Sequence, residues 1–364
     1  MTGIWNHRSS LTRTLQRIQE GELTIGFIGG SITDARPRHN WPEPVIAWFA
    51  ERFPQVTLKI ENAAIGATGS DLAVFRARRD LIERDCDLVF MEYAVNDAEE
   101  PEEKRGRTRE GLIRQLVDGR GRDLLLTYTY CQEMYNDMME GRVPDSISQL
   151  EKLAEHYRLG SVWMGKYALD EVQKGRIRWQ DWLPDGLHPT QRGSLSYAHS
   201  VIAFLEQELL IQHGEDEVTD VTGKPDALYP MNWEKVELLP LEQVKCEGPW
   251  IIRRWVNLEW IDRVLETAAV GSKLSFTFVG RGLALGFDFG RASAEFRYRL
   301  CEGEWKVISR ERPSWVADEG WFRMELIADD LDDGFHDFEL EVIHGNRENC
   351  TGTDFRLAFI GVIR

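Results

Sequence analysis

Residues 23–33 read Leu-Thr-Ile-Gly-Phe-Ile-Gly-Gly-Ser-Ile-Thr and form the first apolar run of the chain. A continuous apolar run of this length is typical of a strand that is buried in a parallel sheet. The run ends in Gly29, Gly30 and Ser31, and open α/β sheets bind ligands at the carboxyl ends of their strands. Ser31 is therefore a candidate nucleophile. The alternatives are that it belongs to an anion-binding turn or that it simply caps a helix.

Outward from this run, strand-like and helix-like patterns alternate about five times in the first ~210 residues. The later strand-like runs are the alternating residues 56–60 and the short runs 88–93, 123–129 and 161–164. The last helical pattern covers residues 191–210, with Thr190 as its N-cap. Such alternation predicts βα units around a parallel sheet that has helices on both faces.

The pattern changes near residue 213, where a polar stretch rich in Gly and Pro begins. Beyond it the apolar residues alternate with period two, and glycine-containing turns separate the runs. This pattern predicts an all-β sandwich of the jelly-roll type. We therefore expect an α/β domain at residues 1–213, a linker at 214–230 and a β-sandwich at 231–364.

The composition excludes several classes of partner. The chain of 364 residues has a formal net charge of -17, which repels nucleic acid and anionic membranes. No stretch approaches the ~18 apolar residues of a membrane span. The N-terminal residues lack the apolar core of a signal peptide, so we expect a cytoplasmic protein. The cysteines have neither disulfide-like nor metal-like spacing, and they are Cys86, Cys131, Cys246, Cys301 and Cys350.

Four polar segments follow predicted strands or precede the last helix, and a parallel sheet brings such segments to one edge. They are Ser31, residues 62–70, Asn96, and the pair Asp185 and His188. A serine hydroxyl becomes a nucleophile when an imidazole takes its proton, and a carboxylate three residues before that imidazole can orient it. The simpler interpretations are that Asp185 and Gly186 form a turn and that Asn96 and Asp97 cap the next helix.

This order of serine, glycine, asparagine and Asp-x-x-His resembles that of the SGNH (GDSL) hydrolase family, over about residues 20–212. The resemblance implies a flavodoxin-like sheet, a serine esterase mechanism and no cofactor or metal. It also implies that Ser31 is the nucleophile, His188 the general base and Asp185 its orienting acid. The amide of Ser31, the amide of Gly66 and the side chain of Asn96 would then form the oxyanion hole.

The sequence departs from the family pattern at three places. Gly30 precedes Ser31, where the family name implies aspartate, and Ala94-Val95 precedes Asn96, where glycine is common. The second segment contains both Gly66 and Ala67. Either amide could complete the oxyanion hole. We prefer Gly66 because it keeps the family's Gly-x-Thr order.

Tryptophans flank the predicted catalytic segments: Trp41 follows the Ser31 loop, and Trp179 and Trp182 precede Asp185. We expect these three rings to bind a sugar substrate, although Trp182 could instead pack beneath the His188 loop. The resemblance is to two-domain SGNH esterases with an attached sandwich, which points to removal of acetyl groups from an imported oligosaccharide. The alternatives are a short-chain esterase, lipase or thioesterase, and a non-catalytic carbohydrate-binding protein. A homo-oligomer is compatible with the sequence.

Overall fold

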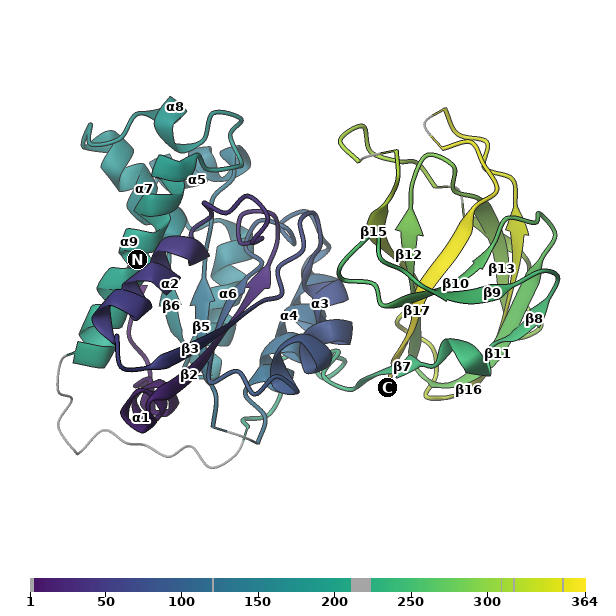
Figure 1. Ribbon diagram of the computed structural model, residues 1–364, viewed down its shortest axis with the longest axis horizontal. Coiled ribbons are helices and arrows are strands. Elements are labelled where there is room, and N and C mark those ends of the chain that lie inside the picture. The colour runs from purple at the N-terminus through teal and green to yellow at the C-terminus, as the bar shows by residue number, and fades with distance from the viewer. Residues whose placement is uncertain (1–2, 120, 211–223, 309, 317, 349) are drawn as a thin grey trace. The chain divides into compact units, whose positions relative to one another are not determined.

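The computed structural model describes residues 3–119, 121–210, 224–308, 310–316, 318–348 and 350–364. The chain divides into two compact units, Met1–Glu234 and Lys235–Arg364 (Figure 1). The first unit is an α/β domain and the second consists of antiparallel sheets.

The first unit is built on a six-stranded sheet with the order β1-β6-β5-β4-β2-β3. Five neighbouring strands are parallel, and only β1 runs antiparallel. Every residue of β4 is buried, as is every residue of β2 after its first. This agrees with apolar strands that are covered on both faces. The strands are β1 (Trp5–Asn6), β2 (Glu22–Gly29), β3 (Thr57–Asn62), β4 (Leu88–Glu92), β5 (Asp123–Thr127) and β6 (Gly160–Val162).

The strand order places a topological switch point beside β2. Numbered by their order along the chain, the parallel strands lie in the flavodoxin-like order 2-1-3-4-5. The chain leaves β2 towards β3 on one side and then returns to β4 on the other side. Segments that follow β2 and β4 therefore diverge at the sheet edge where this type of fold binds ligands.

Helices cover both faces of the sheet. In Figure 1, α3 and α4 lie on one side of it, and α2 and α9 lie on the other. Helix α4 packs against both α3 and α6, while α9 packs against α2, α7 and α8. The helices are α1 (Thr12–Glu20), α2 (Pro42–Arg52), α3 (Ser70–Ala77) with a π turn at Arg78–Ile82, α4 (Glu102–Leu116), α5 (Tyr135–Met139), α6 (Asp145–His156), α7 (Met164–Gln173), α8 (Trp179–Trp182) and α9 (Gln191–Leu210), and one 3₁₀ turn covers Gln132–Met134.

The second unit is a β-sandwich with jelly-roll connectivity. One sheet has the order β15-β12-β17-β10-β9, with β7 also paired to β17, and the other has the order β14-β13-β16-β11-β8. From β10 to β17 each strand lies in the opposite sheet from its predecessor, except in the β13–β14 hairpin. Two interleaved sheets of this kind define the jelly roll.

The strands of the second unit are β7 (Val236–Leu239), β8 (Lys245–Glu247), β9 (Ile251–Arg254), β10 (Arg263–Thr267), β11 (Lys273–Gly280), β12 (Gly282–Phe289), β13 (Glu295–Leu300), β14 (Lys306–Ile308), β15 (Trp321–Ala328), β16 (Gly334–Ile343) and β17 (Phe355–Ile363), with a 3₁₀ turn at Leu241–Gln243. Their inward-facing phenylalanines and leucines form a single core, which includes Phe287, Phe296, Phe338 and Phe355.

Part of the predicted linker packs on the first unit. Residues 214–223 lie outside the described residues, but the amides of Leu228 and Tyr229 donate to the Glu110 carboxylate of α4 at 2.7 and 2.6 Å. The indole of Trp233 is fully buried. A Cβ at Gly111 would lie 2.5 Å from the Trp233 backbone, so this glycine allows the segment to cross α4 closely. Residues 224–234 therefore belong to the α/β unit.

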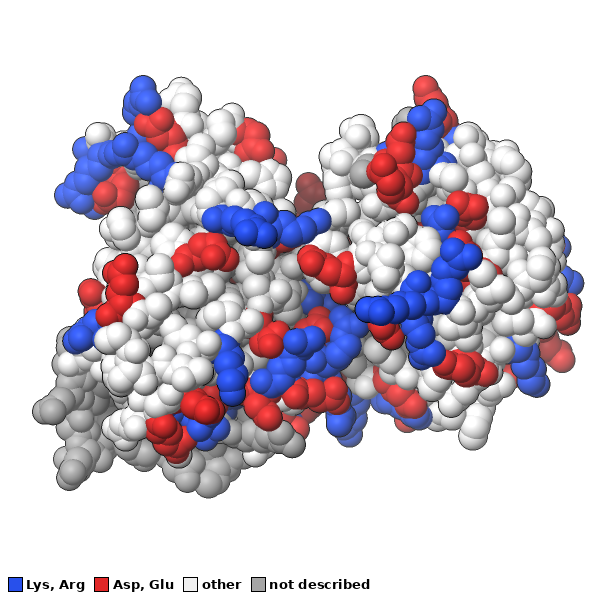
Figure 2. Space-filling view, viewed as in Figure 1, with Lys and Arg blue, Asp and Glu red and all other residues white. Residues whose placement is uncertain are grey.

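The described helices include none that is long and apolar enough to cross a membrane. On the face shown in Figure 2, acidic and basic side chains are interspersed over both units. Such a mixture is typical of a solvated protein surface.

Candidate active site

A short turn after β2 carries Ser31. The amides of Thr33 and Asp34 both donate to the carbonyl of Gly30 at 3.1 Å, so the chain coils as soon as the strand has ended. The buried side chain of Asn40 donates to the Ser31 carbonyl at 2.8 Å. Ser31 is thus fixed at the carboxyl end of β2, beside the switch point.

A second turn, between α8 and α9, carries His188. One oxygen of Asp185 accepts the amides of Leu187 at 2.9 Å and His188 at 2.7 Å. Gly186 has φ +80, a left-handed conformation that glycine adopts without strain. Its carbonyl accepts the Gln132 amide at 2.9 Å, which ties the turn to the segment after β5.

The two turns bring three side chains into one hydrogen-bonded chain. Ser31 Oγ lies 3.0 Å from His188 Nε2, and His188 Nδ1 lies 2.8 Å from Asp185 Oδ2. An ionised Asp185 can only accept, so the proton between them belongs to Nδ1. Nε2 is then the acceptor for the Ser31 hydroxyl proton. This is the arrangement in which an imidazole can act as a general base towards a serine.

The carboxyl group of Asp185 is stabilised in its ionised form. Its partial burial would raise its pKa, but hydrogen bonds from the His188 ring and from the amides of Leu187 and His188 outweigh that effect and lower the pKa. An ionised Asp185 can stabilise the imidazolium that forms when His188 accepts a proton.

Asn96 comes from the segment after β4 and lies against the turn that carries Ser31. A Cβ built on Gly30 would lie 1.9 Å from Asn96 Oδ1 and 2.7 Å from Asn96 Nδ2. The absence of a side chain at position 30 therefore makes room for the Asn96 amide. This contact gives a physical reason for the glycine that precedes Ser31 in this sequence.

Gly66 lies against Ser31 from the β3 side. A Cβ at Gly66 would lie 3.3 Å from Ser31 Cβ and 3.6 Å from a guanidinium nitrogen of Arg36. The next residue, Ala67, has φ +57, so the loop bends at this point. The assignment of Gly66 rather than Ala67 to the oxyanion hole stays a prediction, and so do the catalytic roles of the other residues.

The prediction that Trp41 and Trp182 bind sugar is wrong, because both side chains are buried. Trp41 is fully buried and packs edge-on against both Phe27 and Phe90, and its Nε1 donates to Thr33 Oγ1 at 3.0 Å. A ring enclosed in this way cannot stack on a substrate.

Trp182 is also fully buried. Its ring packs on Tyr130 and Tyr197, with ring centroids 4.9 and 6.2 Å away. It therefore packs in the core next to the turn that carries His188. Trp179 is half-buried and contacts Tyr130 and Tyr135 by ring edges, so it is the remaining candidate.

The structure adds a buried carboxylate that the sequence analysis missed. Glu92, the last residue of β4, is fully buried and accepts the hydroxyls of Thr33 at 3.1 Å and Thr129 at 2.7 Å. Burial raises the pKa of Glu92, and these hydrogen bonds oppose the rise. Its contact with Thr33 supports the turn that carries Ser31. Its position in an apolar run gave no signal of this role.

No protein-family model matches the sequence, and no curated protein matches it. Among solved structures, a two-domain esterase (CEX) active on acetylated mannans, co-crystallised with mannopentaose, aligns with 98% of this chain and 95% of its own, at 22% identity and a TM-score of 0.81. The chain has the fold of this two-domain esterase. The predicted fold, a flavodoxin-like α/β domain followed by a β-sandwich, is therefore confirmed.

A variant of an acetyl xylan esterase from Geobacillus stearothermophilus aligns with part of this chain. It matches 52% of this chain and 97% of its own, at 19% identity and a TM-score of 0.44.

Proposed function

We propose that the chain is a serine esterase that removes O-acetyl groups from oligosaccharides. The observation that carries the proposal is the chain of hydrogen bonds from Ser31 Oγ through His188 to Asp185. It provides a nucleophile, a base and an orienting carboxylate at the edge of the sheet where this fold binds ligands.

The proposed reaction has two steps. In the first, Ser31 Oγ attacks the acetyl carbonyl while His188 Nε2 takes its proton. The carbonyl oxygen becomes an oxyanion, which accepts hydrogen bonds from the Ser31 amide, the Gly66 amide and the Asn96 side chain. His188 then gives its proton to the departing sugar oxygen. In the second step, water attacks the acetyl-serine with His188 again as the base, and acetate leaves.

The sugar part of the proposal rests on two further points. A partly exposed tryptophan, Trp179, lies three residues before Trp182 on the short helix that precedes the base. The structure that aligns with both units is described as an esterase active on acetylated mannans. These points support an acetylated oligosaccharide, whereas a lipase or thioesterase would act on longer acyl chains.

The nucleophile is tested by p-nitrophenyl acetate hydrolysis in Ser31→Ala, which we expect to abolish turnover above background. Undiminished turnover would refute the assignment of Ser31. For Asp185→Asn we expect a severe loss of kcat, up to about 10⁴-fold, with KM largely kept. A loss below about tenfold would show that Asp185 does not orient the base.

The substrate class is tested with acetylated manno-, xylo- and pectic oligosaccharides, with acetate release followed by mass spectrometry. Strong activity on acyl chains beyond C4 would favour a lipase or thioesterase. Binding of these oligosaccharides without any turnover would favour a carbohydrate-binding protein. The cytoplasmic location, the absence of a nucleic-acid partner and the oligomeric state stay predictions, which fractionation and light scattering can test.

A further inference from the structure

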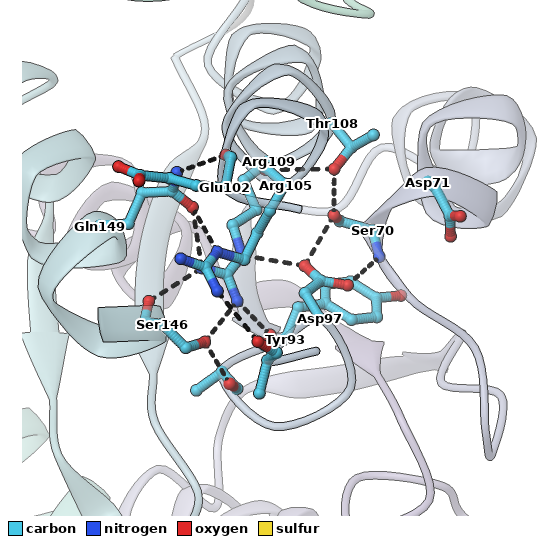
Figure 3. A network of polar contacts seen from close by, with 12 residues as sticks. Ser70, Asp71, Tyr93, Asp97, Glu102, Arg105, Thr108, Arg109, Ser146 and Gln149 are labelled. Carbon is cyan, nitrogen blue, oxygen red and sulfur yellow. Dashed lines mark hydrogen bonds and ion pairs between the residues drawn. The ribbon is translucent and has the colours of Figure 1, made fainter. Parts of the chain in front are cut away.

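A buried arginine lies behind the segment that carries Asn96. Arg109, on α4, is fully buried, and Asp97, the residue after Asn96, is 2% exposed. Arg109 Nε donates to Asp97 Oδ2 at 2.9 Å, and Figure 3 shows the pair at the centre of a network of polar contacts. Burying two charges costs several kcal/mol, which only good geometry and further hydrogen bonds offset.

The guanidinium meets that condition. Its five N–H donors have five contacts: Asp97 on Nε, the Ser146 carbonyl and Gln149 Oε1 on Nη1 at 2.8 and 3.2 Å, and the Tyr93 carbonyl and Ser146 Oγ on Nη2 at 2.7 and 2.8 Å. Because the guanidinium group is planar and rigid, five hydrogen bonds to it fix the direction of its partners as well as their distance.

Two of these contacts lie on either side of Asn96. The Tyr93 carbonyl is three residues before it and the Asp97 carboxylate is one residue after it. Ser146 also holds this segment directly, because its hydroxyl donates to the carbonyl of Ala94. Residues 93–97 are thus held from one side by α4 and α6, while the Asn96 side chain faces Gly30 on the other side.

The same carboxylate reaches the neighbouring loop. Asp97 accepts the Ser70 amide at 2.9 Å and the Ser70 hydroxyl at 2.7 Å, at the start of α3. Ser70 follows the loop that contains Gly66. The network thereby connects the segments after β3 and β4 (Figure 3).

We propose that Arg109 is a positioning residue that sets the place of the Asn96 amide in the oxyanion hole, by holding residues 93–97 through Tyr93 and Asp97. This inference rests on the proposed esterase function. Displacement of a catalytic group by about 1 Å can reduce a rate by as much as ~10²-fold. An effect on the oxyanion appears in kcat and leaves KM nearly unchanged.

The test is a double-mutant cycle with Arg109→Lys and Asn96→Ala on p-nitrophenyl acetate. Lysine keeps the charge but cannot reproduce the fork. We expect Arg109→Lys to lower kcat by about tenfold with KM changed by less than about twofold. In the Asn96→Ala background the same substitution should cost less than about twofold, because the group it positions is gone. An equal loss of kcat in both backgrounds would overturn the proposal.

Asp87→Asn is the matched control. Asp87 is also a buried carboxylate that pairs with arginines, Arg13 and Arg17, but it precedes β4, at the opposite end of the strand from Asn96. The substitution Asp87→Asn should lower the stability of the protein and leave kcat unchanged. A loss of kcat like that of Arg109→Lys would mean that any damage to the core slows the reaction, and would also overturn the proposal.

Ser146→Ala keeps the proposal testable if Arg109→Lys does not fold. It removes one contact of Arg109 and the bond to Ala94, and we expect about a two- to fivefold loss of kcat that disappears in the Asn96→Ala background. No loss would contradict the proposal. Ser31→Ala distinguishes failure of the proposed function from failure of this inference. If that variant stays active, the proposed Ser31 mechanism fails. An inactive Ser31→Ala together with an unaffected Arg109→Lys refutes the positioning role alone.

Discussion

Gly30 allows the assignment of Asn96 to be tested without changing Asn96. In Gly30→Ala, the new Cβ would lie 1.9 Å from Asn96 Oδ1, whereas Cβ atoms essentially never approach another heavy atom within 3.0 Å. The Asn96 side chain must therefore move by about 1 Å, enough to lose the alignment of an oxyanion donor. Loss of one such donor costs about 2.7–4 kcal/mol, so we expect kcat to fall by about 10²–10³-fold.

The assay is p-nitrophenyl acetate hydrolysis, with kcat and KM determined separately and Tm measured alongside. KM and Tm should change little, because the atoms that give way are the end of a partly exposed side chain. Gly26→Ala is the control on the same strand, where a Cβ would lie 2.8 Å from Leu81 Cδ2 and 3.0 Å from Cys86 Sγ.

Overpacking of this core site should cost about 1–3 kcal/mol of stability and leave kcat unchanged. A Gly30→Ala enzyme with kcat within about threefold of wild type would refute the reasoning, since the rate would then not depend on where the Asn96 amide lies.

Three further predictions concern the tryptophans, the thiols and a buried acid. Trp179→Ala should raise KM for an acetylated oligosaccharide and leave p-nitrophenyl acetate turnover unchanged. Trp41→Phe should instead cost about 1 kcal/mol of stability, because the hydrogen bond to Thr33 is lost, and should leave KM for both substrates unchanged. The opposite pattern would restore Trp41 as a substrate contact. Ellman's reagent should modify two thiols in the native protein and five after denaturation, because burial raises the pKa of Cys86 and Cys131 to about 12, Cys350 is also buried, and Cys246 and Cys301 are exposed. Burial raises the pKa of Asp288 to about 6 from an ordinary value of 3.8, so its native form binds a proton more tightly than the unfolded chain and its contribution to stability falls as the pH rises from about 4 to 6. Asp288→Asn should therefore gain stability relative to wild type between pH 4 and pH 7, by up to about 3 kcal/mol in thermal or urea unfolding, and an equal difference at both pH values would contradict this.

Strands β2, β4 and β5 could be predicted because they are buried on both faces and are therefore apolar along most of their length. The same reasoning could not find β1, which is only two residues long, or β9, whose sequence Ile-Ile-Arg-Arg is exposed at every position. An exposed edge strand needs no alternation of apolar residues, so it leaves no periodic signal. The short helix α8 was missed because four residues are too few to show a helical period.

The residues of the candidate site also divide into those that could be predicted from the sequence and those that could not. Ser31, Asp185 and His188 could be placed together because the order of strands decides which loops share an edge. The burial of Trp41 could not be predicted, because it depends on which side chains fill the space beside the loops, whereas the packing of Trp182 beneath the His188 loop was one of the two interpretations that the sequence allowed. Arg109 left no signal either: an arginine on a charged helix resembles a solvated residue until the contacts with Asp97 and Tyr93 are known.

The spacing of the three proposed catalytic residues has a consequence for how activity returns after unfolding. Asp185 and His188 are three residues apart, whereas Ser31 and His188 are separated by 157 residues. The acid and the base can meet within one local turn. Ser31 reaches them only when β2 and the segment before α9 have come together and closed a long loop, a slow and entropically costly event. In a refolding experiment, esterase activity should therefore return after the helical signal in circular dichroism, and its recovery would time the final assembly of the α/β unit.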